Sequence, residues 1–312
     1  MTRYVVIGAG AVGCAIGGLL ARAGAHVAFV ARGAGCEALR RDGVHVVTPQ
    51  TSFVVRVDVL DGAPAPGDVV LLCVQSQHSA EALAVVRERG LAVVCMQNGV
   101  ATERIAAQSF ARVYGAMVWS PLASPQRGCV RIYSEPPHGV VDVGCYPAGV
   151  DPLVETVTRD LRAAGFDARP DPQILRTKYG KLLVSVGNAV EALAGPKARG
   201  SPLSDRVIAE ALRCFAAAGI DYLPLEELLA RVQSVKSLPI DGLHRSGGSM
   251  WQSLDRGAGS VESAFLNGEI VALGERHGIP TPLNRGLVTL SERAAREGWS
   301  PGSVADLERS LG

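Results

Sequence analysis

The sequence predicts an α/β protein in which a doubly wound parallel sheet is followed by an all-helical C-terminal domain. Short apolar runs alternate with helix-length segments in the first half of the chain, whereas the second half contains helical patterns alone. The 312 residues are also enough for about two domains. We therefore expect one domain over residues 1–168 and a second over residues 169–312.

Strand and helix patterns alternate from the N-terminus. Apolar runs of strand length cover residues 4–7, 26–30, 69–74 and 91–96, and helical patterns cover residues 11–23 and 79–89. A strand followed by a helix and another strand is typical of the crossover units that build parallel sheets. Further apolar runs at residues 53–60, 113–118, 130–133 and 140–143 are expected to add later strands to the same sheet.

The pattern changes at Asp171, where helical periods replace strands. They cover residues 171–193, 205–218, 225–235, 260–277 and 283–296. Asp171 followed by proline is typical of a helix start, and Gly219 and Gly278 stand where two helices should end. Residues 237–259 are rich in glycine, serine and proline and predict a long loop, of the kind that often carries function.

The charge balance argues against several classes of partner. The chain carries 31 basic and 30 acidic side chains, a formal net charge of +1, so it lacks the basic excess that binds nucleic acid or anionic membranes. It has no apolar stretch of about 18 residues that would span a bilayer, and no leader pattern precedes the first strand. The seven cysteines form no metal-binding or disulfide pattern. We expect a soluble, cytoplasmic protein.

A glycine-rich turn follows the first expected strand and opens the first expected helix. It has the pattern G-x-G-x-x-G and consists of Gly8, Ala9, Gly10, Ala11, Val12 and Gly13. In this context the first glycine permits a tight turn, the second lets a pyrophosphate approach the backbone, and the third lets helix and strand pack closely. The turn predicts a Rossmann-type domain that binds a dinucleotide.

Arg32 indicates which dinucleotide the domain binds. Sites for NAD place an acidic residue at the end of the second strand, against the ribose 2′-hydroxyl. Here that strand ends Val30-Ala31-Arg32 and no acid follows until Glu37. Since arginine can bind a 2′-phosphate with charge-assisted hydrogen bonds, we expect NADP. A solvated surface arginine would have the same pattern.

Lysine is rare in this chain, and one lysine lies in an apolar helix. Four of the 31 basic residues are lysine, and all lie after residue 177. On one helix over residues 171–193, Lys181, Ser185 and Asn188 share a face, which should point into a cleft. Lys178 lies nearer the helix start and is expected to be exposed. Taken alone, Lys181 would fit a solvated lysine equally well.

Three other polar residues are candidates for the same site. Asn98 follows the strand at residues 91–96, and the carboxyl ends of parallel strands line the ligand crevice. Ser249 lies in the long loop and would bind a substrate carboxylate, whereas Glu262 would pair with a cleft lysine. Each also has a structural interpretation. Asn-Gly is a common turn, serine is common in loops, and a carboxylate is favoured in the first turn of a helix.

These residues together resemble the ketopantoate reductase (2-dehydropantoate 2-reductase) family from end to end. The matching segments are Gly8 to Gly13, Val30-Ala31-Arg32, Gln97-Asn98-Gly99, Lys181 to Val184 with Asn188, Ser249-Met250, Glu262, Asn267-Gly268 and Gly278 to Pro282. The resemblance implies a Rossmann domain that binds NADPH and a helical domain that binds substrate. It also implies that cofactor and substrate meet in a cleft between them.

The resemblance also assigns roles to individual residues. Lys181 matches the catalytic lysine and Glu262 the acid beside it, while Asn98 and Asn188 match active-site asparagines and Ser249 matches the carboxylate-binding serine. Two positions depart from the family pattern. Gln75, beside the expected cofactor, stands where the family usually has lysine, and Ser185, expected to contact substrate, stands where it usually has asparagine.

The resemblance implies NADPH-dependent reduction of a 2-oxo acid to a 2-hydroxy acid. The first expected substrate is 2-dehydropantoate, which the family reduces to pantoate in pantothenate biosynthesis, with Lys181 as proton donor. Because Gln75 and Ser185 depart from the family pattern, a reductase of another branched 2-oxo acid is the alternative. A non-catalytic nucleotide-sensing homologue is a third interpretation. The sequence leaves the oligomeric state open, a homodimer included.

Overall fold

The computed structural model describes residues 2–86 and 90–312, which form two compact units. The first unit comprises residues 1–97, 102–177 and 226–245, and the second comprises residues 98–101, 178–225 and 246–312. The expected segments were 1–168 and 169–312, so the observed division differs at three places. The main boundary falls nine residues later, residues 98–101 join the second unit, and residues 226–245 return to the first.

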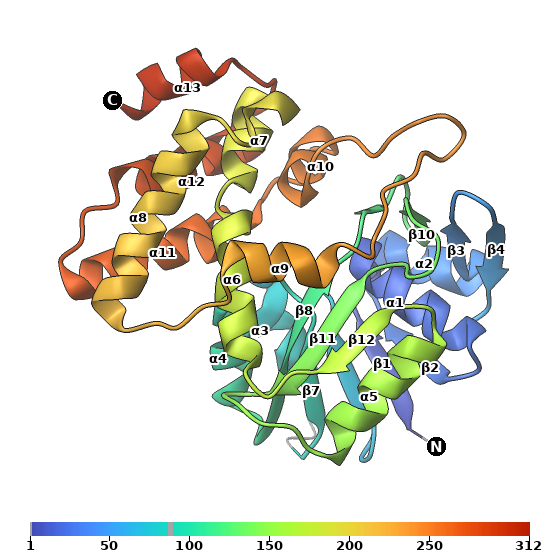
Figure 1. Ribbon diagram of the computed structural model, residues 1–312. Helices are drawn as coiled ribbons and strands as arrows, with labels where there is room; N and C mark the ends of the chain where they lie inside the picture. The colour runs from blue at the N-terminus through green and yellow to red at the C-terminus, as the bar shows by residue number, and fades with distance from the viewer. Residues whose placement is uncertain (1, 87–89) are drawn as a thin grey trace. The chain divides into compact units, whose positions relative to one another are not determined.

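An eight-stranded sheet forms the centre of the first unit (Figure 1). Its strands are β1 (Arg3–Ile7), β2 (His26–Val30), β5 (Asp58–Val59), β6 (Val69–Leu72), β7 (Ala92–Cys95), β8 (Arg112–Trp119), β11 (Val140–Cys145) and β12 (Asp167–Pro170). They lie in the order β12-β11-β8-β7-β6-β1-β2-β5. Neighbouring strands from β8 to β5 pair in parallel, whereas β11 is antiparallel to β8. The expected doubly wound sheet is therefore confirmed.

Helices cover both faces of this sheet. On one face, α1 (Ala11–Arg22) and α5 (Pro152–Ala163) contribute to a core with β1, β2 and β11. On the other face, α3 (Ser79–Ala84) and α4 (Ala101–Ala107) contribute to a core with β6 and β7. The helix α2 (Gly33–Asp42) follows β2 and, like α4 and α5, was not among the helices expected from the sequence. Of the helix expected at residues 79–89, residues 87–89 lie outside the described part of the chain.

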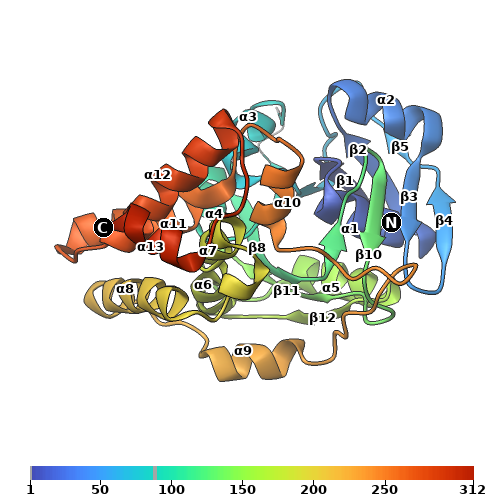
Figure 2. The same ribbon diagram turned by 90° about the horizontal axis from the view of Figure 1, so that it is seen from above.

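A second, four-stranded sheet corrects part of the expectation. It has the order β4-β3-β10-β9 and consists of β3 (Val44–Val47), β4 (Ser52–Val55), β9 (Leu122–Ala123) and β10 (Cys129–Ile132). The runs at residues 53–60 and 130–133 were expected in the main sheet, but only β5 joins it. The small sheet instead packs against α1, where Gly18 leaves room for Val44 and Val46 (Figure 2). An apolar run predicts a strand but does not determine which strand it pairs with.

The second unit consists of helices packed around one apolar core. They are the later part of α6 (Ile174–Ser185), then α7 (Asn188–Ala194), α8 (Pro202–Ala218), α10 (Ser249–Asp255), α11 (Asn267–His277), α12 (Pro282–Glu297) and α13 (Val304–Leu311). Short 3₁₀ turns add η2 (Pro196–Ala198) and η3 (Glu262–Phe265), and η1 (Ser76–His78) lies in the first unit. Within the described residues, no helix is long and apolar enough to cross a membrane.

Three expectations for this half of the chain were wrong. The helix expected at residues 260–277 begins only at Asn267, and residues 262–265 form the 3₁₀ turn η3 instead. The single helix at residues 171–193 is two helices, since α6 ends at Ser185 and α7 begins at Asn188. The long loop at residues 237–259 contains α10, which begins at Ser249. In the latter two places the local glycines permit a break or a turn, but packing against other helices decides which conformation forms.

Residues 226–245 return to the first unit, where Arg231 on α9 (Leu225–Val232) holds them. Its guanidinium donates two hydrogen bonds to Asp142 on β11, at 2.8 and 2.6 Å, and one to Asp167 on β12 at 2.6 Å. Because Val141 and Val143 face the core that contains α5, Asp142 points to the opposite face of the sheet. The segment therefore covers the sheet face away from α5.

Candidate functional site

The glycine-rich turn in the first unit has the geometry of a phosphate cradle. Gly8 follows β1 with a φ of 109°, and a Cβ there would lie 2.8 Å from the backbone nitrogen of Val74. A Cβ at Gly13 would lie 1.9 Å from the carbonyl oxygen of Gly8. These two positions exclude side chains for reasons of the local fold. A Cβ at Gly10, by contrast, would meet no atom within 4 Å.

Gly10 is also the N-cap of α1, and it provides no side-chain cap. The first intrahelical hydrogen bond runs from Cys14 to Gly10, so the backbone N–H groups of Ala11, Val12 and Gly13 have no helical acceptor. No acidic residue occupies this first turn. The open space, the unpaired donors and the helix dipole together fit the pyrophosphate of a dinucleotide.

Arg32 and Gln75 follow strands β2 and β6, which lie on either side of β1 in the sheet. Arg32 comes two residues after β2 and is the N-cap of α2. Its guanidinium pairs with Glu81, and both side chains are exposed. Gln75 precedes η1, and its Oε1 accepts a hydrogen bond of 3.1 Å from Gln77. Both residues lie in the first unit, as the glycine turn does.

Lys181 and Asn98 meet directly in the second unit. The Lys181 Nζ donates a hydrogen bond of 2.7 Å to Asn98 Oδ1. Asn98 belongs to the short segment 98–101, which packs closely on η3 and its neighbours, because a Cβ at Gly99 would lie 2.9 Å from the carbonyl oxygen of Phe265. The segment that carries Asn98 and the turn that carries Glu262 are therefore adjacent.

The surroundings of Lys181 change its acidity strongly. The pKa of Lys181 is lowered from 10.5 to about 7, first by burial and second by the positive charge of Lys178. The negative charge of Glu262, which is 8% exposed, acts in the opposite direction and raises this pKa. At neutral pH the side chain of Lys181 is thus balanced between its charged and neutral forms, as proton transfer requires.

The burial of Lys178 corrects an expectation. We expected this lysine to be exposed at the start of the helix, but its exposed fraction is 3%. The reason is that α6 begins at Ile174, so Lys178 lies in the second turn, one turn before Lys181. Both cations therefore lie on the same helix and repel each other.

The break between α6 and α7 changes the polar face that the sequence predicted. Ser185 donates a hydrogen bond of 3.0 Å from its hydroxyl to the carbonyl oxygen of Lys181, one turn earlier. The carbonyl of Val186 in the break accepts a hydrogen bond of 3.0 Å from Asn267, which is fully buried. Asn188 then starts a new helix instead of continuing the face of Lys181 and Ser185.

Asn188 and Ser249 are connected by two residues that sequence reasoning missed. Glu191 Oε1 accepts a hydrogen bond of 3.0 Å from the backbone nitrogen of Gly248, the residue before Ser249. Glu191 Oε2 accepts a second hydrogen bond of 3.0 Å from Arg199 Nε. The Nη2 of Arg199 donates to Asn188 Oδ1. One signal was available, because Glu191 is the only charged residue in the run 182–194.

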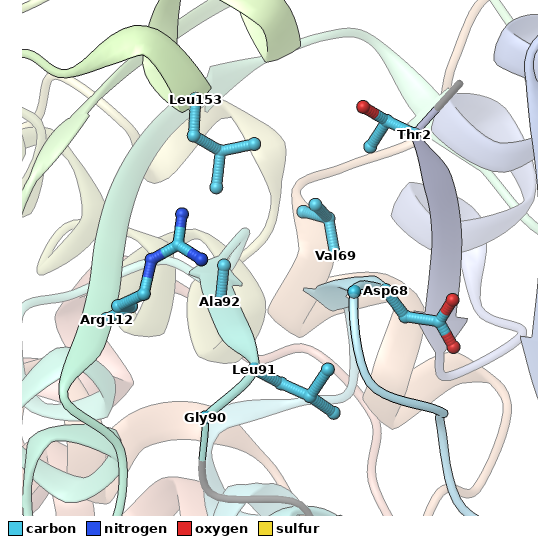
Figure 3. Close-up of a pocket in the computed structure, with 9 residues that line it drawn as sticks. Thr2, Asp68, Val69, Gly90, Leu91, Ala92, Arg112 and Leu153 are labelled. Atoms are coloured by element: carbon cyan, nitrogen blue, oxygen red, sulfur yellow. The ribbon is translucent and has the colours of Figure 1, made fainter.

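A small pocket lies elsewhere in the first unit. It encloses about 170 Å³ and is lined by Thr2, Asp68, Val69, Ala92, Arg112 and neighbours (Figure 3). These residues stand at the amino ends of β1, β6, β7 and β8. The glycine turn follows the carboxyl end of β1, so the pocket lies at the amino ends of the parallel strands and the cradle at their carboxyl ends. Asp68 is already bound to Arg3 by two hydrogen bonds of 2.7 Å.

Family models match almost the whole chain. The model described as "Ketopantoate reductase PanE/ApbA" matches residues 4–147, and the model of its C-terminal domain matches residues 173–295. The 2-dehydropantoate 2-reductase of Archaeoglobus fulgidus is 30% identical over 292 residues, which cover 92% of this chain and 96% of the relative. That of Pyrococcus horikoshii is 26% identical over 295 residues, covering 90% of this chain and 94% of the relative.

Solved structures share the fold. A PanE/ApbA family ketopantoate reductase from Ralstonia eutropha JMP134 superimposes with a TM-score of 0.76 at 24% identity, over 94% of this chain and 98% of that one. D-mandelate dehydrogenase with NADH and anilino(oxo)acetate gives a TM-score of 0.78 at 18% identity, over 99% of both chains. A dimeric ketopantoate reductase from Staphylococcus aureus gives 0.69 at 17% identity, over 95% and 99%.

Both family models and the relatives of nearly equal length indicate the same family. The doubly wound sheet with its glycine turn and the helical unit with its lysine occur in the order that these models describe. The protein belongs to the ketopantoate reductase family of pyridine-nucleotide oxidoreductases, which act on CH–OH groups.

Proposed function

We propose that the protein reduces a 2-oxo acid to a 2-hydroxy acid with NADPH, and that its substrate is 2-dehydropantoate, which yields pantoate. The observation that carries this proposal is the 2.7 Å hydrogen bond between Lys181 and Asn98, on a lysine whose pKa lies at about 7. A lysine with this pKa can give up a proton near neutral pH. The names of the relatives in Archaeoglobus and Pyrococcus support the choice of substrate.

The first unit would hold the cofactor, which supplies a hydride when bound. The N–H groups of Ala11, Val12 and Gly13 would bind its pyrophosphate, and Gly10 would let it approach. Arg32 is exposed and follows β2, where an acidic residue would select NAD, so its guanidinium is suited to a 2′-phosphate. Glu81 would exchange its ion pair with Arg32 for solvent.

Lys181 would act as the proton donor. As an ammonium it would donate a hydrogen bond to the 2-oxo oxygen and then transfer the proton as the oxygen becomes an alkoxide. Asn98 accepts a hydrogen bond from Lys181 and so orients its ammonium group. Glu262 would favour the charged form of Lys181, and Lys178 would oppose it. Asn188 and Ser249 would hold the substrate carboxylate and hydroxyl.

A second candidate is the reduction of another branched 2-oxo acid. It is favoured by the two departures from the family pattern, Gln75 in place of lysine and Ser185 in place of asparagine. The hydroxyl of Ser185 donates its hydrogen to the Lys181 carbonyl, so it offers a substrate only an acceptor. A substrate that needs an amide donor at this position would bind less well. The presence of Lys181 with Glu262 argues against a third candidate, a non-catalytic nucleotide sensor.

A screen of 2-oxo acids with NADPH and NADH would test these proposals by the loss of reduced-cofactor absorbance. We expect the largest kcat/KM for 2-dehydropantoate with NADPH. A larger value for another branched 2-oxo acid would favour the second candidate, and no turnover of any acid would favour the third. The double variant Gln75→Lys with Ser185→Asn should then shift the ranking among acids. An unchanged ranking would mean that these departures do not affect substrate choice.

We also propose that the protein is a homodimer, an assembly supported by the dimeric ketopantoate reductase from Staphylococcus aureus. Light scattering of the purified protein would measure its molar mass. A value near the 32.6 kDa of one chain would contradict the proposal, and a value near twice that mass would support it.

A further inference from the structure

We propose that Arg199 binds the carboxylate of the 2-oxo acid and that Glu191 is the positioning residue that holds Arg199 in place. This inference rests on the proposed function and adds a determinant of substrate class. The site would then select 2-oxo carboxylates over neutral 2-oxo amides and esters. Neither residue belongs to the set that the sequence and the family resemblance indicated.

The guanidinium of Arg199 is fixed on one edge and open on another. Its Nε and Nη2 lie 3.0 and 2.9 Å from Glu191 Oε2, and Nη2 also donates to Asn188 Oδ1. Its Nη1 makes no hydrogen bond within the part of the chain that the structure describes. The Arg199 side chain is 46% exposed, whereas that of Glu191 is 8% exposed. The pair therefore consists of a buried carboxylate, Glu191, and a solvent-accessible guanidinium, Arg199.

Ser249 lies beside this pair. The backbone nitrogen of Gly248 donates to Glu191 Oε1, and a Cβ at Gly248 would lie 3.0 Å from Glu191 Oε2 and 3.6 Å from Arg199 Nη2. The chain before Ser249 is thus in close contact with both side chains. Glu191 fixes the start of α10 and the guanidinium at the same time.

The donors that remain in this cluster suit an oxyanion. Since Asn188 Oδ1 accepts from Arg199, its Nδ2 is left to donate. The hydroxyl of Ser249 is a further donor. A carboxylate accepts several such hydrogen bonds, and arginine matches its planar geometry. Because Glu191 already holds the guanidinium in one orientation, little conformational freedom is lost when the substrate binds.

With this assignment, Lys181 and Arg199 have different roles in the second unit. Lys181 is bound to Asn98 and titrates near neutral pH, which suits proton transfer to the carbonyl oxygen. A guanidinium remains charged at every working pH, so it suits a carboxylate that is charged throughout the reaction. The carboxylate and the reacting carbonyl would then have separate partners.

The test compares a 2-oxo acid with its neutral amide. For Arg199→Met we expect the KM of the acid to rise about tenfold or more, because a charge-assisted hydrogen bond is typically worth at least that factor. The KM of the amide and the kcat of both should change little. Arg199→Lys, which keeps the charge but loses the planar fork, should give an intermediate KM for the acid. Arg206→Met is the matched control, since Arg206 pairs with Glu308 on the surface of the same unit.

Glu191→Gln tests the positioning role. It keeps an acceptor for Gly248 but removes the ion pair with Arg199, so the KM of the acid should rise. In the double variant with Arg199→Met it should have no further effect on the ratio of acid KM to amide KM. A purely structural role of Glu191 would change that ratio in neither background.

Several results would overturn the proposal. If Arg199→Met raises the KM values of acid and amide equally, or raises neither, then Arg199 does not bind the substrate carboxylate. Protection against thermal unfolding by acid or amide, measured in the presence of NADPH, gives the same comparison without turnover. If the unaltered protein is stabilised by a 2-oxo acid but reduces none, the proposed function fails while the carboxylate site stands. Equal protection of unaltered protein and Arg199→Met by the acid would refute the site itself.

Discussion

Lys178 should shift the working pH of the enzyme, although it is not itself a proton donor in our proposal. Its charge lowers the pKa of Lys181, which lies one turn later on α6. Replacing Lys178 with methionine removes that charge but keeps the length of the buried side chain. The ammonium of Lys181 then becomes easier to form, and its pKa should rise.

The size of the shift follows from the helix geometry. Side chains three residues apart are neighbours on a helix, so we take about 7 Å between the two charges. The repulsion is then about 0.6 kcal/mol at the dielectric constant of water and about 2.4 kcal/mol at an effective value of about 20. Since one pKa unit corresponds to about 1.4 kcal/mol, the pKa of Lys181 should rise by about 0.4 to 1.7 units.

The assay is the pH dependence of kcat/KM with NADPH. A proton donor must be protonated, so activity is high below the pKa of Lys181 and falls as the pH rises through it. In the unaltered enzyme the fall should centre at a pH of about 7. Lys178→Met should move it to higher pH. Glu262→Gln, which removes the carboxylate that raises this pKa, should move it to lower pH.

Opposite shifts from the two variants are the signature of direct charge interaction. Lys197→Met is the control, because Lys197 is an exposed lysine of the same unit. A direct effect of the Lys178 charge on Lys181 is refuted if Lys178→Met leaves the profile in place, or if it moves the fall in activity to lower pH. A profile that moves equally in the Lys197 control would indicate a general effect of net charge instead.

Three further changes test other parts of the structure. Lys181→Ala should lower kcat about a hundredfold or more, the typical contribution of a positioned proton donor, while NADPH binding measured by fluorescence should persist; a fully active variant would exclude Lys181 as the donor. Arg32→Ala should raise the KM for NADPH about tenfold and leave that for NADH nearly unchanged, since one charged hydrogen bond is lost; equal use of both cofactors by the unaltered enzyme would contradict NADP preference. Arg231→Met should lower the free energy of unfolding in urea by about 3 kcal/mol, because Asp142 and Asp167 lose their shared partner; an unchanged midpoint would mean that solvent replaces it.

The sequence by itself determined the features that depend on short stretches of chain. The run at residues 4–7, the turn from Gly8 to Gly13 and the next helix form one local unit, because the tight turn and the close packing need glycines at fixed spacing. The helical periods of the second half likewise predicted α8 and α12 closely. Such patterns reflect the period of a helix or strand, which the sequence displays directly.

Contacts between distant residues were decided only by the tertiary structure. Asn267 binds the Val186 carbonyl 81 positions away, at the break that separates α6 from α7. Arg231 binds Asp142 across 89 positions and returns α9 to the first unit. The link from Glu191 to Gly248 brings Ser249 beside Arg199. No periodicity encodes these pairs, because each bond depends on where two separate elements pack, and that is set by the whole core.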